Sequence, residues 1–263
     1  MNSLKKSFLL FLAFQLLVLS SATASGISNR NKNKHFFNTN IEYSINSHFS
    51  IGGSAPLGLP TEIRKIESYN PNLQLGIGAN ATKWLYDDSD LGIRVGVSVH
   101  AKGMKTKARV RNYRTEVIID KLYMKGIFTG MVETRVKNTY LTIPVSMVYK
   151  LSDRWRLYGG PHISFTLDSG FDGFVSDGKF KPEDSTSDDI LFEEDDQAAY
   201  DFSDSVRKLQ LGVHAGGEWS LRKNLVLFSH LDYDFNDLFK KDFNSLTFAL
   251  HNIYLNIGFG YRF

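Results

Sequence analysis

The chain has 263 residues, 42% of them hydrophobic and 13% aromatic, and its formal net charge is +3. A chain of this length suits one all-β domain. It has no cysteine, which excludes a disulfide scaffold, a thiol nucleophile, a cysteine-ligated zinc site and a lipid anchor on an N-terminal cysteine.

The N-terminus has the pattern of a secretory signal peptide. Lys5 and Lys6 form a charged region, residues 8–19 are apolar, and small residues at 22–24 suit cleavage. The apolar segment is shorter than the ~20 residues of a membrane-spanning helix. We expect a signal peptide at 1–24, a short periplasmic leader at 25–38 and one domain at 39–263. Removal of both lysines leaves a nearly neutral protein, so nucleic acid is not an expected partner.

Apolar and polar residues alternate in eight segments of this domain, and this period of two predicts strands. The apolar residues carry odd numbers in all eight, although Val226, Phe228 and Tyr254 break the pattern locally. The predicted strands span residues 40–51, 73–82, 91–100, 141–149, 155–167, 208–221, 225–236 and 248–263.

The connections between these segments alternate between long and short, as in outer-membrane barrels with short periplasmic turns and longer external loops. We therefore predict an all-β, eight-stranded antiparallel up-and-down transmembrane β-barrel with both termini in the periplasm. A soluble lipocalin-like barrel, with its apolar face inside, is the alternative. Glycine on the polar face favours a narrow polar lumen. Aromatic residues near the short turns favour a membrane interface, and they are Tyr149, Trp155, Trp219, Tyr261 and Phe263.

Three segments resemble the PorT-like outer-membrane β-barrel family: Tyr140–Val145, Leu157–Pro161 and Gly258–Phe263. The resemblance extends over about residues 36–263 and implies a non-enzymatic barrel of the outer membrane. Some members of that family serve the type IX secretion apparatus. The resemblance also implies that the barrel assembly machinery recognises the C-terminal strand that ends at Phe263.

Charged residues with inward parity are expected to pair, because unpaired charges in a confined lumen are costly. The expected result is a structural plug, and a gate or a proton relay is the alternative. Pro144 cannot donate a ladder hydrogen bond, so we expect a bulge or bend there. The predicted inward charges are Glu42, Arg94, Arg156, Lys208, Glu218, Asp232, Asp234 and Arg262.

Five of the seven histidines share the inward parity, and they are His48, His100, His162, His214 and His230. A structural network is the expected role. Metal binding or pH sensing is the second possibility, because neutral imidazole is a common metal ligand. A hydrolase triad of His230, Asp232 and a serine such as Ser164 is the third. We assign no catalytic, cofactor-binding or metal-binding residue, and we expect no enzymatic activity and no cofactor.

Two long connections, 103–137 and 168–205, are expected as external loops of opposite charge. The first is basic and the second acidic. They could pair with each other across the barrel mouth, or remain solvated. The basic loop could instead meet lipopolysaccharide phosphates, and the acidic run at 193–196 could gather calcium without EF-hand spacing. Residues 115–119 favour β-structure, so the third and fourth strands could extend beyond the membrane.

The sequence thus predicts a structural or accessory protein of the outer membrane that supports protein secretion or envelope assembly. Its expected partners are outer-membrane lipid, the assembly machinery and a secretion-system or envelope protein. Two alternatives are a lipid- or metal-binding barrel and a surface recognition or adhesion protein that acts through its charged loops.

Overall fold

The structure, a computed structural model, describes residues 40–85, 89–119, 121–183 and 189–263. The expected signal peptide and leader, residues 1–38, lie outside these ranges. Within them, no helix has the length and apolar character needed to cross a membrane.

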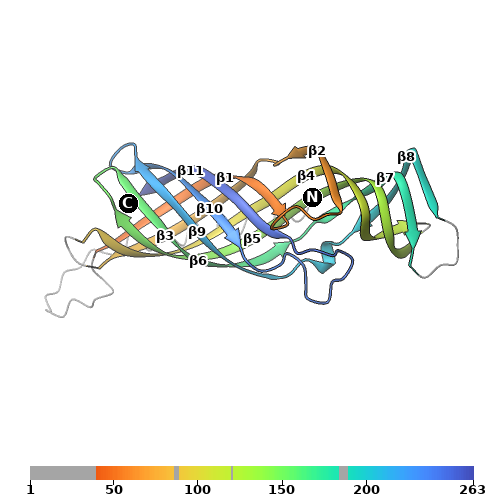
Figure 1. Cartoon of the computed structure of the whole chain (residues 1–263). Helices are drawn as coiled ribbons and strands as arrows, with labels where there is room; N and C mark the ends of the chain where they lie inside the picture. Colours follow the sequence, from red (N-terminus) through yellow and green to blue (C-terminus); the bar gives the residue numbers. More distant parts are fainter. Residues whose placement is uncertain (1–39, 86–88, 120, 184–188) are drawn as a thin grey trace, which may run out of the picture. The chain divides into compact units, whose positions relative to one another are not determined.

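The described residues form one antiparallel sheet of eleven strands and one turn of 3-10 helix, drawn in Figure 1. In chain order these are β1 (Ile41–Ala55), β2 (Ile63–Asn70), β3 (Gln74–Trp84), β4 (Leu91–Ile119), β5 (Leu122–Lys150), β6 (Trp155–Asp168), β7 (Phe171–Pro182), β8 (Ile190–Asp201), η2 (Ser203–Ser205), β9 (Leu209–Ser220), β10 (Leu225–Asp234) and β11 (His251–Arg262).

Eight of these strands pair in a closed cycle, which runs β1, β3, β4, β5, β6, β9, β10, β11 and back to β1. We call this cycle the ring. Each predicted strand overlaps one strand of the ring. The expectation of eight strands in all is wrong, because β2, β7 and β8 also belong to the sheet.

Two short turns, residues 151–154 and 221–224, join ring strands at one end of the ring. We call it the short-turn end. Figure 1 shows the C-terminus at this end, while β7 and β8 lie at the far end. At the short-turn end the Trp155 and Trp219 rings stack with centroids 6.1 Å apart. The aromatic residues predicted near the short turns therefore do lie there.

The loop prediction for residues 103–137 is wrong, since β4 and β5 are each 29 residues long. Together with β7 and β8 they build a sheet beyond the ring, which we call the projecting sheet. The apolar–polar alternation continues in it with the opposite sense: Met104 is buried, whereas Lys105 and Lys107 are exposed. High charge is typical of loops, but here it marks only the exposed face of a strand. Residues 168–205, the other predicted loop, likewise contain β7 and β8.

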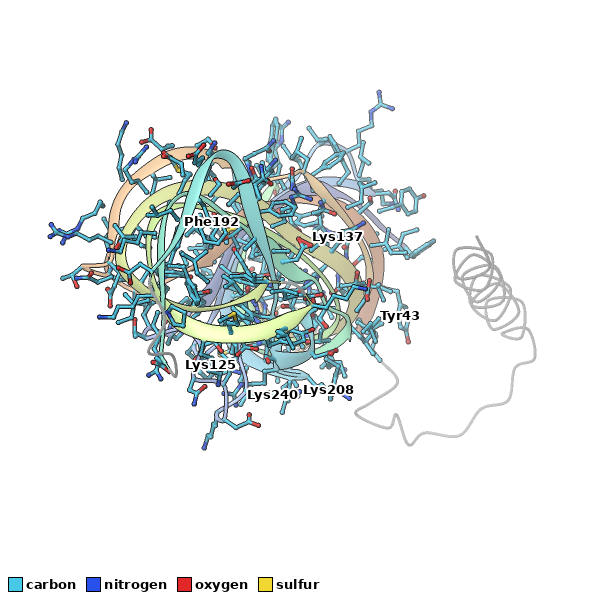
Figure 2. The ribbon with its side chains drawn as sticks, turned by 90° about the vertical axis from the view of Figure 1, so that its right-hand side faces the viewer. Tyr43, Lys125, Lys137, Phe192, Lys208 and Lys240 are labelled. Carbon is cyan, nitrogen blue, oxygen red and sulfur yellow. The ribbon has the colours of Figure 1, made fainter. Side chains whose placement is uncertain are left out.

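The outward face of the ring is apolar and the inward face is polar. Ile45 and Val95 are each 48% exposed, whereas Arg94 is 5% exposed and Asn256 is fully buried. A soluble barrel would have the reverse arrangement, so the lipocalin-like alternative is wrong. Figure 2 looks along the unit from the projecting sheet and shows Lys208 and Lys240 at its periphery.

Pro144 interrupts the hydrogen-bonded ladder without a bulge. Between β5 and β6 the pairing runs from Pro144 with His162 to Met147 with Gly159, in one unchanged register. The expected bulge is therefore absent at Pro144, and the ladder has a local break between these two pairs.

The hydrophobic core lies in the projecting sheet, not in the ring. It gathers side chains from β4, β5, β7 and β8 and from the segments around η2 and before β11. Phe171 and Phe239 pack edge to face with centroids 4.9 Å apart, and Phe239 stacks on Phe243 at 4.2 Å. The buried members are Met104, Val110, Tyr113, Val117, Phe128, Val132, Val136, Phe171, Val175, Phe180, Ala198, Tyr200, Phe202, Val206, Leu238, Phe239 and Leu250.

The closeness of β1 and β11 allows a test of the ring closure. A Cβ on Gly258 would lie 2.1 Å from the Ser47 carbonyl oxygen, whereas the nearest atoms to a Cβ on Gly217 are 3.5 Å away. Gly258→Ala should lower the free energy of unfolding by about 1–3 kcal/mol, the usual cost of overpacking. Gly217→Ala should change it by less than about 0.5 kcal/mol. Urea unfolding in liposomes measures both, and equal effects would contradict the β1–β11 register.

Candidate functional site

Five charged side chains join five strands of the ring near the short-turn end. Glu218 of β9 accepts hydrogen bonds from Arg94 of β4 and, at 2.7 Å, from Arg262 of β11. Glu42 of β1 accepts two bonds from Arg156 of β6, at 2.6 and 3.0 Å, and lies 3.6 Å from Arg262. All five were predicted to face inward and to pair, and both expectations are confirmed.

Lys102 is a buried lysine that directly precedes the predicted basic loop and is not among the predicted inward charges. Only 1% of it is exposed. Its Nζ lies 3.4 Å from Asp232 Oδ2 and 3.8 Å from Asp234 Oδ2, and 5.6 and 5.3 Å from the ring centroids of Tyr140 and Tyr254. Its even number, two residues after His100, was the signal that could have identified it as inward-facing.

Both predicted aspartates are buried inside the ring, where amides complete their hydrogen bonding. Asn256 donates to Asp232 and Asn252 donates to Asp234, each at 2.9 Å. Lys208, by contrast, is exposed. The prediction that Lys208 faces inward is wrong, because this residue precedes the first ladder position of β9 at Leu209.

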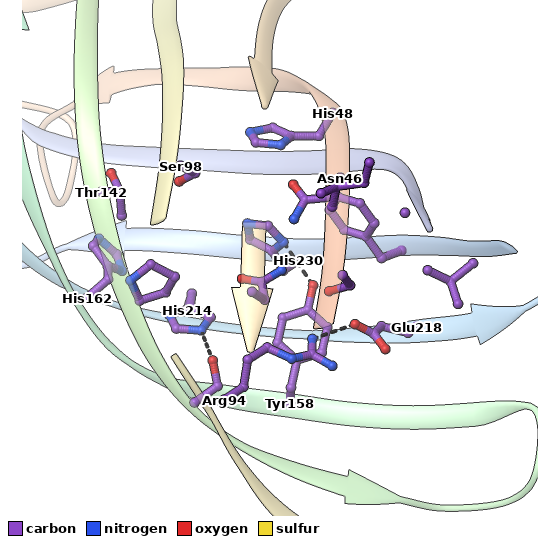
Figure 3. Close-up of a pocket in the computed structure, with 18 of the residues that line it drawn as sticks. Asn46, His48, Arg94, Ser98, Thr142, Tyr158, His162, His214, Glu218 and His230 are labelled. Carbon is purple, nitrogen blue, oxygen red and sulfur yellow. Dashed lines mark hydrogen bonds and ion pairs between the residues drawn. The ribbon is translucent and has the colours of Figure 1, made fainter. Parts of the chain in front are cut away.

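The ring brings all five predicted histidines together, and Figure 3 shows four of them around one cavity. The centroids of successive imidazoles lie 5.7 Å apart from His100 to His48, 6.1 Å from His48 to His230, 6.1 Å from His230 to His214, and 5.8 Å from His214 to His162. The imidazoles thus form a continuous chain across the lumen.

Most of this chain is held by neighbouring side chains. Tyr158 Oη lies 2.9 Å from His230 Nδ1, and Ser146 Oγ lies 2.7 Å from His214 Nε2. His162 Nε2 lies 2.7 Å from Asp234 Oδ1. His48 is different, since both its ring nitrogens are buried without a hydrogen-bond partner in the described protein.

Neither a metal centre nor the hydrolase triad is assembled in the described ranges. No group of three or more histidine, aspartate or glutamate side chains there could hold a metal ion. His230 Nε2 does lie 3.4 Å from Asp232 Oδ1. Ser164, however, is fully buried and its hydroxyl bonds Thr142 Oγ1 at 2.7 Å.

The lumen is filled. The cavity beside the histidines has a volume of about 70 Å³, which is room for about two water molecules at ~30 Å³ each. At this level the polar network therefore fills most of the lumen of the described ring, as expected of a structural plug.

The oppositely charged segments pair with each other in the projecting sheet. Arg109 lies 3.3 Å from Asp177, and Arg114 lies 2.9 Å from Glu183. These contacts confirm the expectation that the segments could pair. For calcium at 193–196, the side chains of residues 194 and 195 lie outside the described part, so that possibility stays a prediction.

Glu133 of β5 forms ion pairs with two basic side chains on the outward face of the projecting sheet. Lys105 Nζ lies 3.0 Å and Arg135 Nη2 3.2 Å from its Oε1. Partial burial raises the pKa of Glu133, but the hydrogen bonds from Lys105 and Arg135 outweigh it, so the pKa is below its usual value. Glu133 is therefore anionic at neutral pH.

The fold and its inside-out polarity agree with a family comparison. The model of the outer membrane protein beta-barrel domain matches residues 24–240. The chain belongs to this family. It is accordingly an outer-membrane protein with an antiparallel, barrel-like sheet, and the apolar outward face of the ring is its lipid-facing surface.

Solved structures similar to this barrel include three outer-membrane proteins. Ail of Yersinia pestis, in complex with the heparin analogue sucrose octasulfate, has a TM-score of 0.38 at 14% identity over 86% of this chain and 100% of Ail. OprG from Pseudomonas aeruginosa gives 0.31 at 12% identity over 84% and 95% of the two chains. Neisserial surface protein A gives 0.29 at 11% identity over 86% and 98%. No curated protein matches the sequence.

The buried ion pair of Lys102 should be a main support of the barrel. Lys102→Met leaves Asp232 and Asp234 without their cation, and loss of one partner of a buried pair costs about 3–5 kcal/mol. Lys105→Met, on the opposite face of the same strand, should cost less than about 1 kcal/mol. Urea unfolding in liposomes compares the two.

A triple variant, with Lys102→Met, Asp232→Asn and Asp234→Asn, removes all three charges together. It should recover most of the stability that Lys102→Met loses. Equal stability of the Lys102 and Lys105 variants would show that Lys102 is not buried.

Proposed function

We propose that this outer-membrane barrel is a surface recognition protein, and that its projecting sheet binds an anionic partner outside the cell. The observation that supports this most is a row of basic residues on one face of β4. Lys105, Lys107, Arg109 and Arg111 alternate along the strand, and all four are exposed. We call them the basic row.

The projecting sheet is built to hold that row in a fixed position. Its strands share ladders, since β5 pairs with β7 and β7 with β8. Its inner side has a hydrophobic core of its own, in which Val117, Phe128 and Val175 are fully buried. Recognition surfaces on rigid elements lose less conformational entropy on binding than mobile loops do.

The charge of the basic row is only partly compensated. Lys105 and Arg109 each have one carboxylate partner, Glu133 and Asp177. Lys107 and Arg111 have no ion-pair partner in the described ranges. The neighbouring edge strand β2 places Lys65 opposite Arg109, and Lys65 itself pairs with Glu67 at 2.8 Å.

The plugged lumen supports recognition over transport. The cavity of about 70 Å³ beside the histidines leaves little room for a solute. The function of the ring is then to hold the sheet at the membrane. We infer that the short-turn end faces the periplasm and the projecting sheet the outside, with the signal peptide directing export. The assembly machinery would recognise β11 together with Phe263.

Neutralising the basic row tests the proposal. The variant Lys105→Gln, Lys107→Gln, Arg109→Gln, Arg111→Gln should bind dextran sulfate on the order of 100-fold or more weakly than wild type, because each cation near an anionic surface contributes about 1 kcal/mol. Binding is measured with the full-length protein in nanodiscs on a sensor surface, with neutral dextran as the blank.

The matched control removes four cations from the short-turn end, with Lys150→Gln, Arg154→Gln, Arg222→Gln and Lys223→Gln. It should retain wild-type binding, which should weaken as salt is added. If the two variants bind equally well, net charge and not the basic row is responsible, and the proposal fails.

A second candidate is an accessory role in type IX-like secretion or envelope assembly. The PorT-like segments favour it, and they lie in β5, β6 and β11. Their structural roles are visible: Tyr140 is fully buried and packs beside Lys102, and Pro144 and Pro161 lie at the break in the β5–β6 ladder. These roles are architectural, so the support comes from the resemblance.

Deletion of the gene in its own cell distinguishes this candidate. An accessory secretion protein should leave secreted cargo in the periplasm when it is absent, measured by comparing periplasmic and culture-supernatant fractions. Restoring the wild-type gene should restore export. Normal export in the deletion strain would exclude the secretion role and leave the recognition proposal intact.

A further inference from the structure

A second, larger cavity lies at the base of the projecting sheet. Its volume is about 530 Å³, within the ~300–1,000 Å³ of ligand pockets in proteins. None of its lining residues is charged, and most are aliphatic or aromatic. Apolar cavities of only ~150 Å³ already bind small hydrocarbons, so this one can hold a much larger apolar ligand.

The few polar groups in the lining are mostly engaged elsewhere. The Ser54 hydroxyl donates to Asn252 Oδ1 at 2.6 Å, and Thr134 Oγ1 lies 2.6 Å from Tyr200 Oη. Tyr69 Oη donates to the Gly52 carbonyl at 2.8 Å. Few polar groups therefore remain to hold water in the cavity, and the lining favours a hydrocarbon.

The cavity lies between β1 and β2, whose facing edges form no ladder with each other, and we call this junction the seam. Above the ring, residues Ile51–Ala55 of β1 pair with β11 only, because the β1–β3 ladder ends at Ser50. Across the seam, β2 forms a backbone ladder only with β4 among the described strands, and the Tyr69 hydroxyl joins β2 to β1 through its bond to the Gly52 carbonyl. Both facing edges line the cavity, β1 through Gly52–Ala55 and β2 through Ile63, Ile66 and Tyr69.

The rim of the cavity is apolar on its outer side. Leu59, Ile66 and Tyr69 line the cavity and are 64%, 54% and 51% exposed. Leu57 and Leu73 continue this exposed surface on either side along the chain. An exposed apolar rim of this extent marks a site of contact with lipid or another apolar ligand.

We propose that this cavity binds one acyl chain of a membrane lipid, which rises from the adjoining outer leaflet and enters through the seam between β1 and β2. Arg64 is exposed on β2 beside the rim, where it suits an anionic headgroup, and the neighbouring Lys65 pairs with Glu67 at 2.8 Å. The site is separate from the plug, and it does not depend on partner binding by the basic row.

Photo-cross-linking tests the proposal in nanodiscs that contain phosphatidylglycerol with a diazirine in the middle of one acyl chain. Cross-linked residues are mapped by mass spectrometry. Met104, Ala108 and Val132 line the cavity, and cross-links to them should appear in wild type. Cross-links to the lipid-facing residues Ile45 and Val95 serve as the internal reference.

Two variants fill the cavity from opposite walls. Ala108→Phe on β4 and Ala55→Trp on β1 should each lower cavity cross-linking relative to the internal reference by about ten-fold, because the added ring occupies the space of the chain. Ala101→Phe, on the same strand outside the cavity, should leave it unchanged. If one filling variant does not fold, the other decides.

Three results would overturn the proposal. One is cross-linking confined to lipid-facing residues in wild type. Another is cavity cross-linking that persists in every folded filling variant. The third is labelling by a diazirine fatty acid added free in solution while the phospholipid gives none, which would assign the cavity to a free fatty acid instead of a membrane lipid.

Discussion

Strands that cross lipid must satisfy all of their backbone hydrogen bonds within the protein, because lipid tails offer no partners. The ring meets this condition by pairing eight strands in a cycle. A ring this narrow leaves an interior that side chains can fill. With hydrocarbon outside, polar groups are directed inward, where each charge needs a partner. The arginine–glutamate network and the Lys102 pairs are consequences of that confinement.

The protein consequently has two kinds of interior, and they meet along β4. Inward positions change from the charged Lys102 to the apolar Met104, both buried. Outward positions change over the same residues, from Val99, 40% exposed, to the exposed Lys105. Inside and outside therefore exchange polarity at one level. A change from lipid to water around the strand accounts for both switches, and it places the edge of the membrane near residues 101–104.

The ring could be predicted from the sequence because its alternation has one sense throughout. Odd-numbered apolar positions recur in all eight strands, and inward parity correctly placed Arg94, Glu218 and the histidines. The same rule failed at Lys208, where the ladder had not yet begun, and it was not applied to Lys102, whose surroundings in the sequence are basic. The strands beyond residue 102 could not be predicted from composition, because exposed lysines and arginines on a strand resemble those of a loop.

Parity also says which residues face the lumen, but not which of them touch. The offset between neighbouring strands decides that. His48 meets His100 and His230, although the three are more than fifty residues apart in sequence. The two cavities were not predicted either. The larger one depends on where the β1–β3 ladder stops, at Ser50, and residue type does not specify that end.

The pairing of β1 with β11 has a consequence for the order of folding. Ser50 bonds Asn256, a partner 206 positions along the chain, whereas β4 and β5 are hairpin neighbours joined at Ile119 and Leu122. Loops must be closed before distant contacts contribute, so pairings of high contact order form late. The long hairpin can form before the first strand meets the last one. Until those two strands pair, the wall has two open edges, and the barrel is not sealed.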